Sequence, residues 1–284
     1  MEQIPHVEYA FINGSGTWAS NFPEDCADPD VTVIKRNMVI DTPYGETVPL
    51  KLIHIEANRE GTTSKDVLVI PMHGNHYKDN VSRLEGSDQI FWVLQKAGVK
   101  KIVSEASVGG INHLLEVGDI VVPHDFIEGR TSRGMVFCGG DMRMRDPFCP
   151  EIRAILIEEA QNLFPRVMKK GVSISAEGPR FESVAEIQMM HQWGADIVGH
   201  TVTPEIYYAR TIGACFGIVN IIANGAEGVG EEWEDIEAAK RLYRSWAIPM
   251  GKMVLKAMKR VSVNDKCTCH LYSPANMEQI RPTA

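Results

Sequence analysis

The sequence has no long apolar run and no surplus of positive charge. None of its apolar runs approaches the roughly 18 residues of a membrane-spanning helix, and Met1, Glu2 and Gln3 do not begin an apolar signal segment. We therefore expect a cytoplasmic protein without a membrane partner. Lysine and arginine number 29 against 37 aspartate and glutamate residues, which gives a net charge of −8. Because binding to nucleic acid needs clustered basic residues, this deficit favours a small-molecule partner over a nucleic-acid one.

Cysteine is scarce as well, with 6 among 284 residues. Four of the six, Cys26, Cys138, Cys149 and Cys215, lie far apart in the sequence. Such scatter is typical of reduced thiols in a cytosolic enzyme rather than of a disulfide framework. Internal repeats, low-complexity tracts and linkers are also missing, so the sequence gives no reason to divide the chain into two domains.

The chain alternates short apolar runs rich in β-branched residues with longer segments of helical periodicity. The predicted strands are residues 9–12, 67–70, 101–103, 119–122, 171–174 and 216–219. The predicted helices are residues 87–97, 149–163, 183–193 and 234–259, with a kink or break at Pro249. This alternation predicts the α/β class, as a single-domain, three-layer α/β/α fold around a central mixed β-sheet. We assign residues 1–261 to this domain, with a hairpin at residues 38–55, and residues 262–284 to an extended C-terminal tail.

Three polar loops follow predicted strands, where open α/β sheets bind their ligands. They are residues 13–17 (NGSGT), 72–77 (MHGNHY) and 106–112 (ASVGGIN). Small residues in such loops allow backbone N–H groups to approach an anion, although each loop is also compatible with an ordinary turn. His73 and His76 have no further ligands at a recognisable spacing, so they do not predict a metal site.

The most specific segments lie in the second half of the chain. They are EGPRFESVAE from Glu177, WGADIVGHT from Trp193, PE at 204–205 and NIIANGAEG from Asn220. Two further segments are VGDIVVPHDFI from Val117 and DPFCP from Asp146. With the three loops above, all these segments follow the order, and nearly the spacing, of the motifs of one family. From about residue 8 to residue 259 the chain resembles the methylthioadenosine phosphorylase and purine nucleoside phosphorylase family.

The resemblance implies a pentosyltransferase of purine salvage, in which phosphate displaces a purine base from C1′ of a ribosyl group. The products are the free base and ribose 1-phosphate or its 5-substituted relative. Such a reaction must stabilise negative charge on the departing purine and hold phosphate below the sugar, and neither task needs a metal or an organic cofactor. We therefore expect phosphate as co-substrate and no cofactor. The resemblance also implies a homotrimer in which one subunit lends a side chain to its neighbour's active site.

The resemblance assigns phosphate binding to Ser15, His73, Ser107 and Thr201. One loop departs from the family pattern, because Met72 and Asn75 stand where relatives place an arginine. Loss of a guanidinium removes the strongest type of phosphate contact. Lys78, Arg83 or an arginine of a neighbouring subunit could compensate, although the first two could equally be solvated loop charges. The missing arginine leaves a phosphate-independent nucleoside hydrolase as an alternative.

The resemblance assigns catalysis at the base to Glu182 and Asn224. Glu182 can accept a hydrogen bond from N1–H of a 6-oxopurine, and Asn224 can bond O6 and N7 through one amide. The adenine-directed branch instead carries aspartates where this chain has Asn224 and Ala226. We therefore predict an inosine, guanosine or 5′-methylthioinosine type of substrate, with S-methyl-5′-thioadenosine phosphorylase as the alternative. From the residues alone, Glu182 could instead cap a helix and Asn224 could lie in a turn with Gly225.

Three more residues are predicted to bind the nucleoside, namely Phe181, Gly199 and His200. Phe181 matches an aromatic residue that lies against the purine. His200 stands where relatives commonly have methionine beside the ribose hydroxyls, so it could bond a hydroxyl or indicate an altered sugar. Together with Met72 and Asn75, it leaves open a catalytically weak nucleoside-binding protein. The acidic segment 231–235 does not indicate which 5′ substituent of the nucleoside the site accepts.

The segment Cys267-Thr268-Cys269-His270 resembles the Cys-x-Cys near the C-terminus of many bacterial and archaeal relatives. It could form a small strained disulfide, bind a metal with His270, or remain two thiols. Two cysteines and one histidine do not complete a zinc site, so free thiols are expected and no metal site is predicted.

Overall fold

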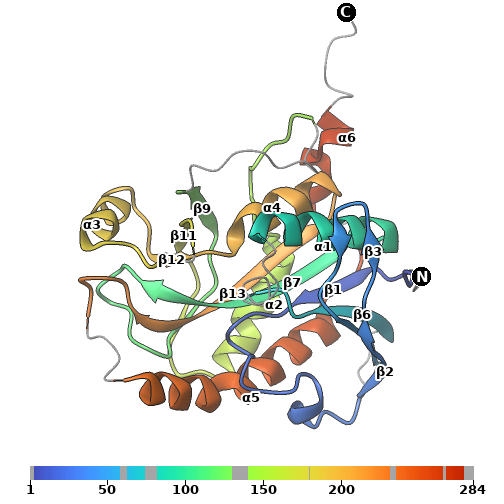
Figure 1. Cartoon of the computed structure of the whole chain (residues 1–284), viewed down its shortest axis with the longest axis horizontal. Helices are drawn as coiled ribbons and strands as arrows, with labels where there is room; N and C mark the ends of the chain where they lie inside the picture. The colour runs from blue at the N-terminus through green and yellow to red at the C-terminus, as the bar shows by residue number, and fades with distance from the viewer. Residues whose placement is uncertain are drawn as a thin grey trace, which may run out of the picture.

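The computed structural model describes residues 3–57, 63–73, 82–129, 140–178, 180–230, 235–264 and 267–277. Within these residues, eleven strands form one mixed sheet, and most of them follow the order β10-β8-β13-β7-β1-β6-β5-β2 (Figure 1). The strands on this path are β1 (Tyr9–Ile12), β2 (Val31–Met38), β5 (Leu50–Ile55), β6 (Lys65–Ile70), β7 (Lys101–Gly110), β8 (Ile120–Val121), β10 (Val167–Met168) and β13 (Cys215–Gly225). The sheet continues from β7 through β12 (Ile197–Gly199) and β11 (Val172–Ser175) to β9 (Asp125–Glu128).

The centre of the sheet is parallel and covered on both faces. Strands β6, β1, β7 and β13 run parallel, and their residues point alternately to two cores. Phe11 and Val69 pack with helices α2 (Pro150–Gln161) and α5 (Ile236–Arg260), whereas Ile12 and Ile70 pack with α1 (Arg83–Ala97) and α4 (Val202–Thr211). The high apolar content of these strands on both faces follows from burial on both sides. The predicted three-layer α/β/α fold with a mixed sheet is confirmed.

The remaining elements lie around this core. They are η1 (Glu24–Cys26), the hairpin strands β3 (Asp41–Thr42) and β4 (Gly45–Glu46), α3 (Val184–Gln192), η2 (Cys269–Tyr272) and α6 (Pro274–Met277). The predicted hairpin at residues 38–55 is confirmed by two antiparallel pairs, β3 with β4 and β2 with β5. Gly45 has φ of 101° at the tip, where glycine is the least strained residue.

Some predicted boundaries differ from the structure. Helix α5 runs through Pro249 without the break that was considered, because Trp246 and Met253 on either side of the proline are buried in one core. Such packing offsets the hydrogen bond that proline cannot donate. The segment after residue 261 was predicted to be an extended tail, but its described part forms η2 and α6 and contacts α4. In the described residues, no helix is long and apolar enough to cross a membrane.

Candidate active site

A cavity of about 270 Å³ opens where the parallel strands β1, β6, β7 and β13 end. Carboxyl ends of parallel strands are the expected place for a ligand in an open α/β sheet. The cavity brings together every residue that the sequence predicted for the site, from six separate segments. They are Ser15, His73, Ser107, Phe181, Glu182, Gly199, His200, Thr201 and Asn224. The geometry is compatible with the roles assigned to them, and those roles stay predictions.

Two serine hydroxyls meet on one side of the cavity. Ser15 follows β1, Ser107 lies in β7, and their Oγ atoms are hydrogen-bonded to each other. The backbone N–H of Ser107 also donates to Ser15 Oγ over 3.0 Å. Tyr243 of α5 adds a third hydroxyl, 3.0 Å from Ser107 Oγ. Burial raises the pKa of Tyr243, so its phenol stays protonated at neutral pH and can donate a hydrogen bond.

A fully buried carboxyl group holds the loop that carries Ser15. Glu105 Oε1 accepts from the backbone N–H of Gly14 over 2.6 Å and from Thr17 Oγ1 over 2.7 Å. A Cβ atom at Gly16 would lie 2.2 Å from Glu105 Oε2, so the approach requires glycine. Burial raises the pKa of Glu105, and the hydrogen bonds from Thr17 and Gly14 oppose this shift.

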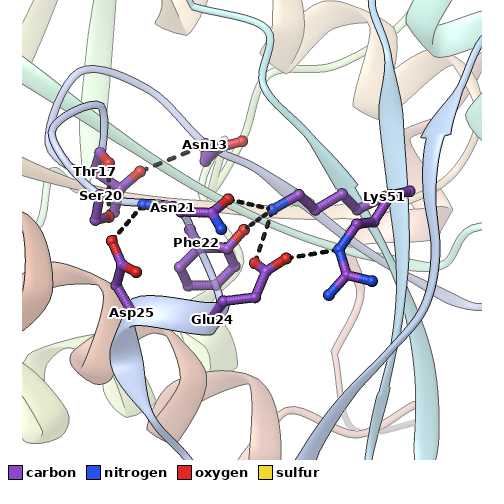
Figure 2. Close-up of polar contacts among 9 residues, drawn as sticks. Asn13, Thr17, Ser20, Asn21, Phe22, Glu24, Asp25 and Lys51 are labelled. Atoms are coloured by element: carbon purple, nitrogen blue, oxygen red, sulfur yellow. Dashed lines mark hydrogen bonds and ion pairs between the residues drawn. The ribbon is translucent and has the colours of Figure 1, made fainter.

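The segment that follows this loop, residues 21–24, is hydrogen-bonded to Lys51 of strand β5, as Figure 2 shows. Lys51 Nζ donates to the carbonyl of Phe22 over 2.6 Å, to Asn21 Oδ1 over 2.9 Å and to Glu24 Oε2 over 2.8 Å. Ser20 Oγ donates to the carbonyl of Thr17 over 2.8 Å. The predicted phosphate loop is therefore held by Glu105, and the segment that follows it is held by Lys51.

His73 lines the cavity from the end of β6 and pairs with a buried glutamate. Its Nε2 lies 2.5 Å from Glu205 Oε1, and the exposed fractions of the two side chains are 6% and 1%. Its Nδ1 has no hydrogen-bond partner among the described residues. The indole N–H of Trp18 donates to the carbonyl of His73 over 2.8 Å. The imidazole is thus held in one orientation at the cavity wall.

Met72, which stands where relatives place an arginine, is not part of the cavity lining. Its side chain is buried in the core beneath α1 and α4. Asn75 and Lys78 lie outside the described residues, as does the side chain of Arg83. Thr201 precedes α4, and its hydroxyl makes no capping hydrogen bond to the helix, so it remains available to a ligand.

The structure excludes the alternative that Glu182 caps a helix. Helix α3 is capped by Ser183, whose hydroxyl accepts from the N–H of Glu186, while the Glu186 carboxylate accepts from the N–H of Ser183. Glu182 is therefore not the helix cap. It lines the cavity, and its Oε1 lies 3.2 Å from His200 Nε2.

Asn224 is not in a turn but near the end of β13, just after an irregularity in its pairing with β7. Its Nδ2 donates to the carbonyl of Gly225 over 2.7 Å. An amide has two N–H donors and a carbonyl acceptor, so this bond fixes the side chain and leaves polar capacity for a ligand. Phe181 is 61% exposed, which leaves its ring accessible.

Sequence reasoning missed several residues that the structure places at the site. Tyr243 lies in a long helix whose sequence carries no motif, and only its distance from Ser107 identifies it. Glu205 was quoted within the PE motif without a role, and Glu105 was not singled out. Both support other side chains from buried positions, which residue type alone does not indicate.

Possible metal ligands lie outside this cavity. The sulfur atoms of Cys149, Cys215, Cys267 and Cys269 all lie within 4.8 Å of one another. His270, which the sequence offered as a possible ligand, is exposed. The sequence considered only the Cys-x-Cys pair, because nothing in the spacing of Cys149 and Cys215 indicates that β13 and α2 begin beside the C-terminal segment.

Comparison with known proteins agrees with the geometry. The profile of the Phosphorylase superfamily matches residues 26–257. A probable 6-oxopurine nucleoside phosphorylase from Moorella thermoacetica is 28% identical over 93% of this chain and 97% of its own length. The S-methyl-5′-thioadenosine phosphorylase of Pyrococcus abyssi is 31% identical over 91% of this chain and 94% of its own length.

Solved structures agree on the fold. A crystal structure of a methylthioadenosine phosphorylase sourced from an antarctic soil metagenomic library has a TM-score of 0.78 at 23% identity, covering 96% of this chain and 92% of that one. The resemblance read from the sequence motifs is confirmed, together with its enzyme class. The chain belongs to the Phosphorylase superfamily.

Proposed function

We propose that the chain is a purine nucleoside phosphorylase that cleaves the N-glycosidic bond of a 6-oxopurine nucleoside with phosphate. The products are the free base and ribose 1-phosphate or its 5-substituted relative. One observation carries the proposal, namely that Ser15, His73 and Ser107 line the same cavity as Glu182 and Asn224. A relative from Pyrococcus furiosus named 6-oxopurine nucleoside phosphorylase, 28% identical, supports it.

In this proposal, phosphate binds to the group formed by Ser15, His73 and Ser107, together with Thr201. The serine hydroxyls can rotate from each other to the phosphate oxygens, and Tyr243 steadies Ser107. The hydrogen bond between His73 Nε2 and Glu205 Oε1 holds the imidazole ring in one orientation at the wall of the cavity, where the phosphate would contact it.

The purine binds to a second group, formed by Glu182, His200 and Asn224. The Glu182 carboxylate accepts from N1–H of the base, while the Asn224 amide donates to O6 and accepts from N7 as N7 takes up a proton. Charge that develops on the leaving purine is thus met by a hydrogen-bonded, pre-oriented amide. Phe181 covers the face of the base.

His200 has a third possible role beyond the two that the sequence suggested. Its Nε2 is 3.2 Å from Glu182 Oε1, so it holds this carboxylate in place for the base. We propose that His200 is a positioning residue, which acts on the purine through Glu182.

A second candidate is S-methyl-5′-thioadenosine phosphorylase, which relatives from two Pyrococcus species at 30% and 31% identity favour by their names. Adenine has a lone pair at N1 and a 6-amino donor, so both would face the wrong partner in Glu182 and the Asn224 N–H. Because Ala226 also cannot bond N7, we favour the 6-oxopurine.

A substrate screen tests the proposal. Inosine, guanosine, adenosine and their 5′-methylthio analogues are each incubated with and without phosphate, and base release is measured. We expect phosphate-dependent release from the 6-oxopurine nucleosides. Release at the same rate without phosphate would indicate a hydrolase, and no turnover with any nucleoside would indicate a binding protein.

The homotrimer expected from the resemblance stays a prediction, as do the cytoplasmic location, the absence of a cofactor and the division into a domain of residues 1–261 and a tail. Light scattering tests the assembly directly. A monomer or a hexamer would contradict it, and then a side chain from a neighbouring subunit would not complete the cavity in the way expected.

A further inference from the structure

Four of the six cysteines meet at one place, at the opposite end of β13 from the cavity. Cys215 is the first residue of β13, Cys149 is the N-cap of α2, and Cys267 and Cys269 come from the C-terminal segment. Their sulfur atoms lie within 4.8 Å of one another, and Cys215 Sγ is 3.0 Å from Cys267 Sγ. Three segments that are distant in the sequence thus converge on one small volume. The proposed catalysis uses none of these thiols.

We propose that these four cysteines bind one zinc ion as a closed structural site. In a tetrahedral tetrathiolate site, Zn–S distances of about 2.3 Å place the sulfur atoms roughly 3.8 Å apart. A separation of at most 4.8 Å is close to this arrangement. A [4Fe–4S] cluster holds each thiolate on a different iron atom, and a [2Fe–2S] cluster holds them as two separated pairs. Both need some of the sulfur atoms farther apart than observed here, so the spacing favours a single ion. Four soft thiolate ligands select zinc over hard cations.

The charge around the sulfur atoms is compatible with such a site. Zinc replaces the four thiol protons, and the resulting tetrathiolate carries a charge of about −2. Lys101 is 2% exposed, and its Nζ donates to Cys267 Sγ over 3.8 Å and pairs with Glu151. Arg210 is 3% exposed and donates to the carbonyl of Cys269 over 2.8 Å. Two buried cations beside the sulfur atoms offset the negative charge, as outer partners of metal ligands commonly do.

The place of the site indicates what the ion does. Asn224 lies nine positions after Cys215 along β13, which is roughly 30 Å at the rise of a strand. An ion there is too far away to contact the nucleoside. It would instead fasten the segment with η2 and α6 to the first residues of α2 and β13. All four zinc positions are filled by protein, which is the arrangement of structural sites.

Zinc content of the purified full-length chain tests the proposal independently of enzyme activity. The chain is purified in the presence of a thiol reductant, without a metal-affinity step, and analysed for zinc. We expect about one zinc ion per chain. Removal of zinc with a chelator should lower the melting temperature, and added Zn²⁺ should restore it. Added Co²⁺ should give the intense sulfur-to-metal charge-transfer band and visible bands of a tetrahedral tetrathiolate site.

Matched variants locate the site. Cys149→Ser and Cys269→Ser should lose most of the zinc, whereas Cys26→Ala, which removes a buried thiol elsewhere in the core, should keep it. If a serine variant fails to fold, the Co²⁺ spectrum of the wild-type chain still decides the question. Reduced wild-type protein that takes up neither zinc nor cobalt overturns the proposal. So does an intact mass lower by four hydrogens in metal-free protein, which indicates two disulfides, or equal loss of zinc in Cys26→Ala.

Discussion

The two groups of side chains in the cavity are supported very differently. Ser15, His73 and Ser107 extend from the parallel centre of the sheet and are held by partners that are almost fully buried. Glu105 is 0% exposed beneath the serine loop, and Glu205 is 1% exposed behind His73. The serine–histidine group is therefore fixed before any ligand arrives, which lowers the cost of ordering it on binding.

Glu182, His200 and Asn224 form the other group, and their hydrogen-bond partners are less deeply buried. Glu182 lies on the loop before α3, beside Phe181 with an exposed fraction of 61%. His200 lies on the loop after β12. Substitutions here disturb fewer buried contacts than substitutions in the serine–histidine group. The comparison suggests that the proposed phosphate group is backed by buried carboxyl groups, whereas the proposed base group has less deeply buried support.

The largest effect is expected for His73→Gln, which removes the imidazole ring from the cavity wall and leaves the buried carboxyl group of Glu205 without its partner. We expect kcat/KM for phosphate to fall by about a hundredfold or more, equivalent to ~3 kcal/mol. Steady-state kinetics at varied phosphate concentrations measures this fall in kcat/KM. The exposed His113→Gln serves as control and should behave as wild type. Unchanged phosphate kinetics in a folded His73→Gln protein would show that the pair with Glu205 is only structural.

Asn224→Asp tests the base group and should change preference rather than phosphate binding. An aspartate accepts from the 6-amino group of adenine, or donates to N7 when protonated, so it favours adenosine. We expect the ratio of kcat/KM for inosine to that for adenosine to fall about thirtyfold, or ~2 kcal/mol. The KM for phosphate in the same variant is the internal control. If the wild-type chain cleaves adenosine as fast as inosine, the roles given to Glu182 and Asn224 are wrong.

Ser107→Ala and Thr201→Val should each raise the apparent KM for phosphate about tenfold, because each removes one hydrogen bond to an ion. The KM for the nucleoside should change less. Ser107→Ala also removes the hydrogen bond to Tyr243, so Tyr243→Phe is the matched variant that isolates this contact. We expect a smaller rise in KM, about threefold, for Tyr243→Phe. Equal changes in both Michaelis constants would argue against phosphate binding by these residues.

The sequence predicted the fold and the residues that line the cavity, because both depend on local signals. Apolar runs predicted strands such as residues 9–12 and 67–70, and the loops after them contain Ser15 and His73. Strands β7 and β13 are longer than predicted. The predictions were too short because Ser107 and Asn224 are not typical strand residues, yet the two strands pair with each other along their length. Such pairing is a tertiary effect that periodicity does not indicate.

Contacts between distant segments could not be predicted from the sequence. The bond between Tyr243 and Ser107 joins residues 136 positions apart, and that between His73 and Glu205 spans 132 positions. Similarly, Cys149 and Cys215 became candidate ligands only when the fold placed them beside Cys267 and Cys269. From residue types alone, Cys267 and Cys269 could form a disulfide, bind a metal with His270 or remain free thiols.

His200→Met is expected to have the smallest effect, and it separates positioning of the base from contact with the sugar. Methionine cannot bond Glu182, so the carboxylate loses the partner that lies 3.2 Å from its Oε1. Loss of this one part-buried hydrogen bond should raise the KM for inosine about threefold. If His200 acts through Glu182, the variant Glu182→Gln should remove most of this difference, so that the double variant resembles Glu182→Gln alone. Additive effects in the double-mutant cycle would instead indicate that His200 contacts the ribose directly, and the phosphate KM should stay constant in all four proteins.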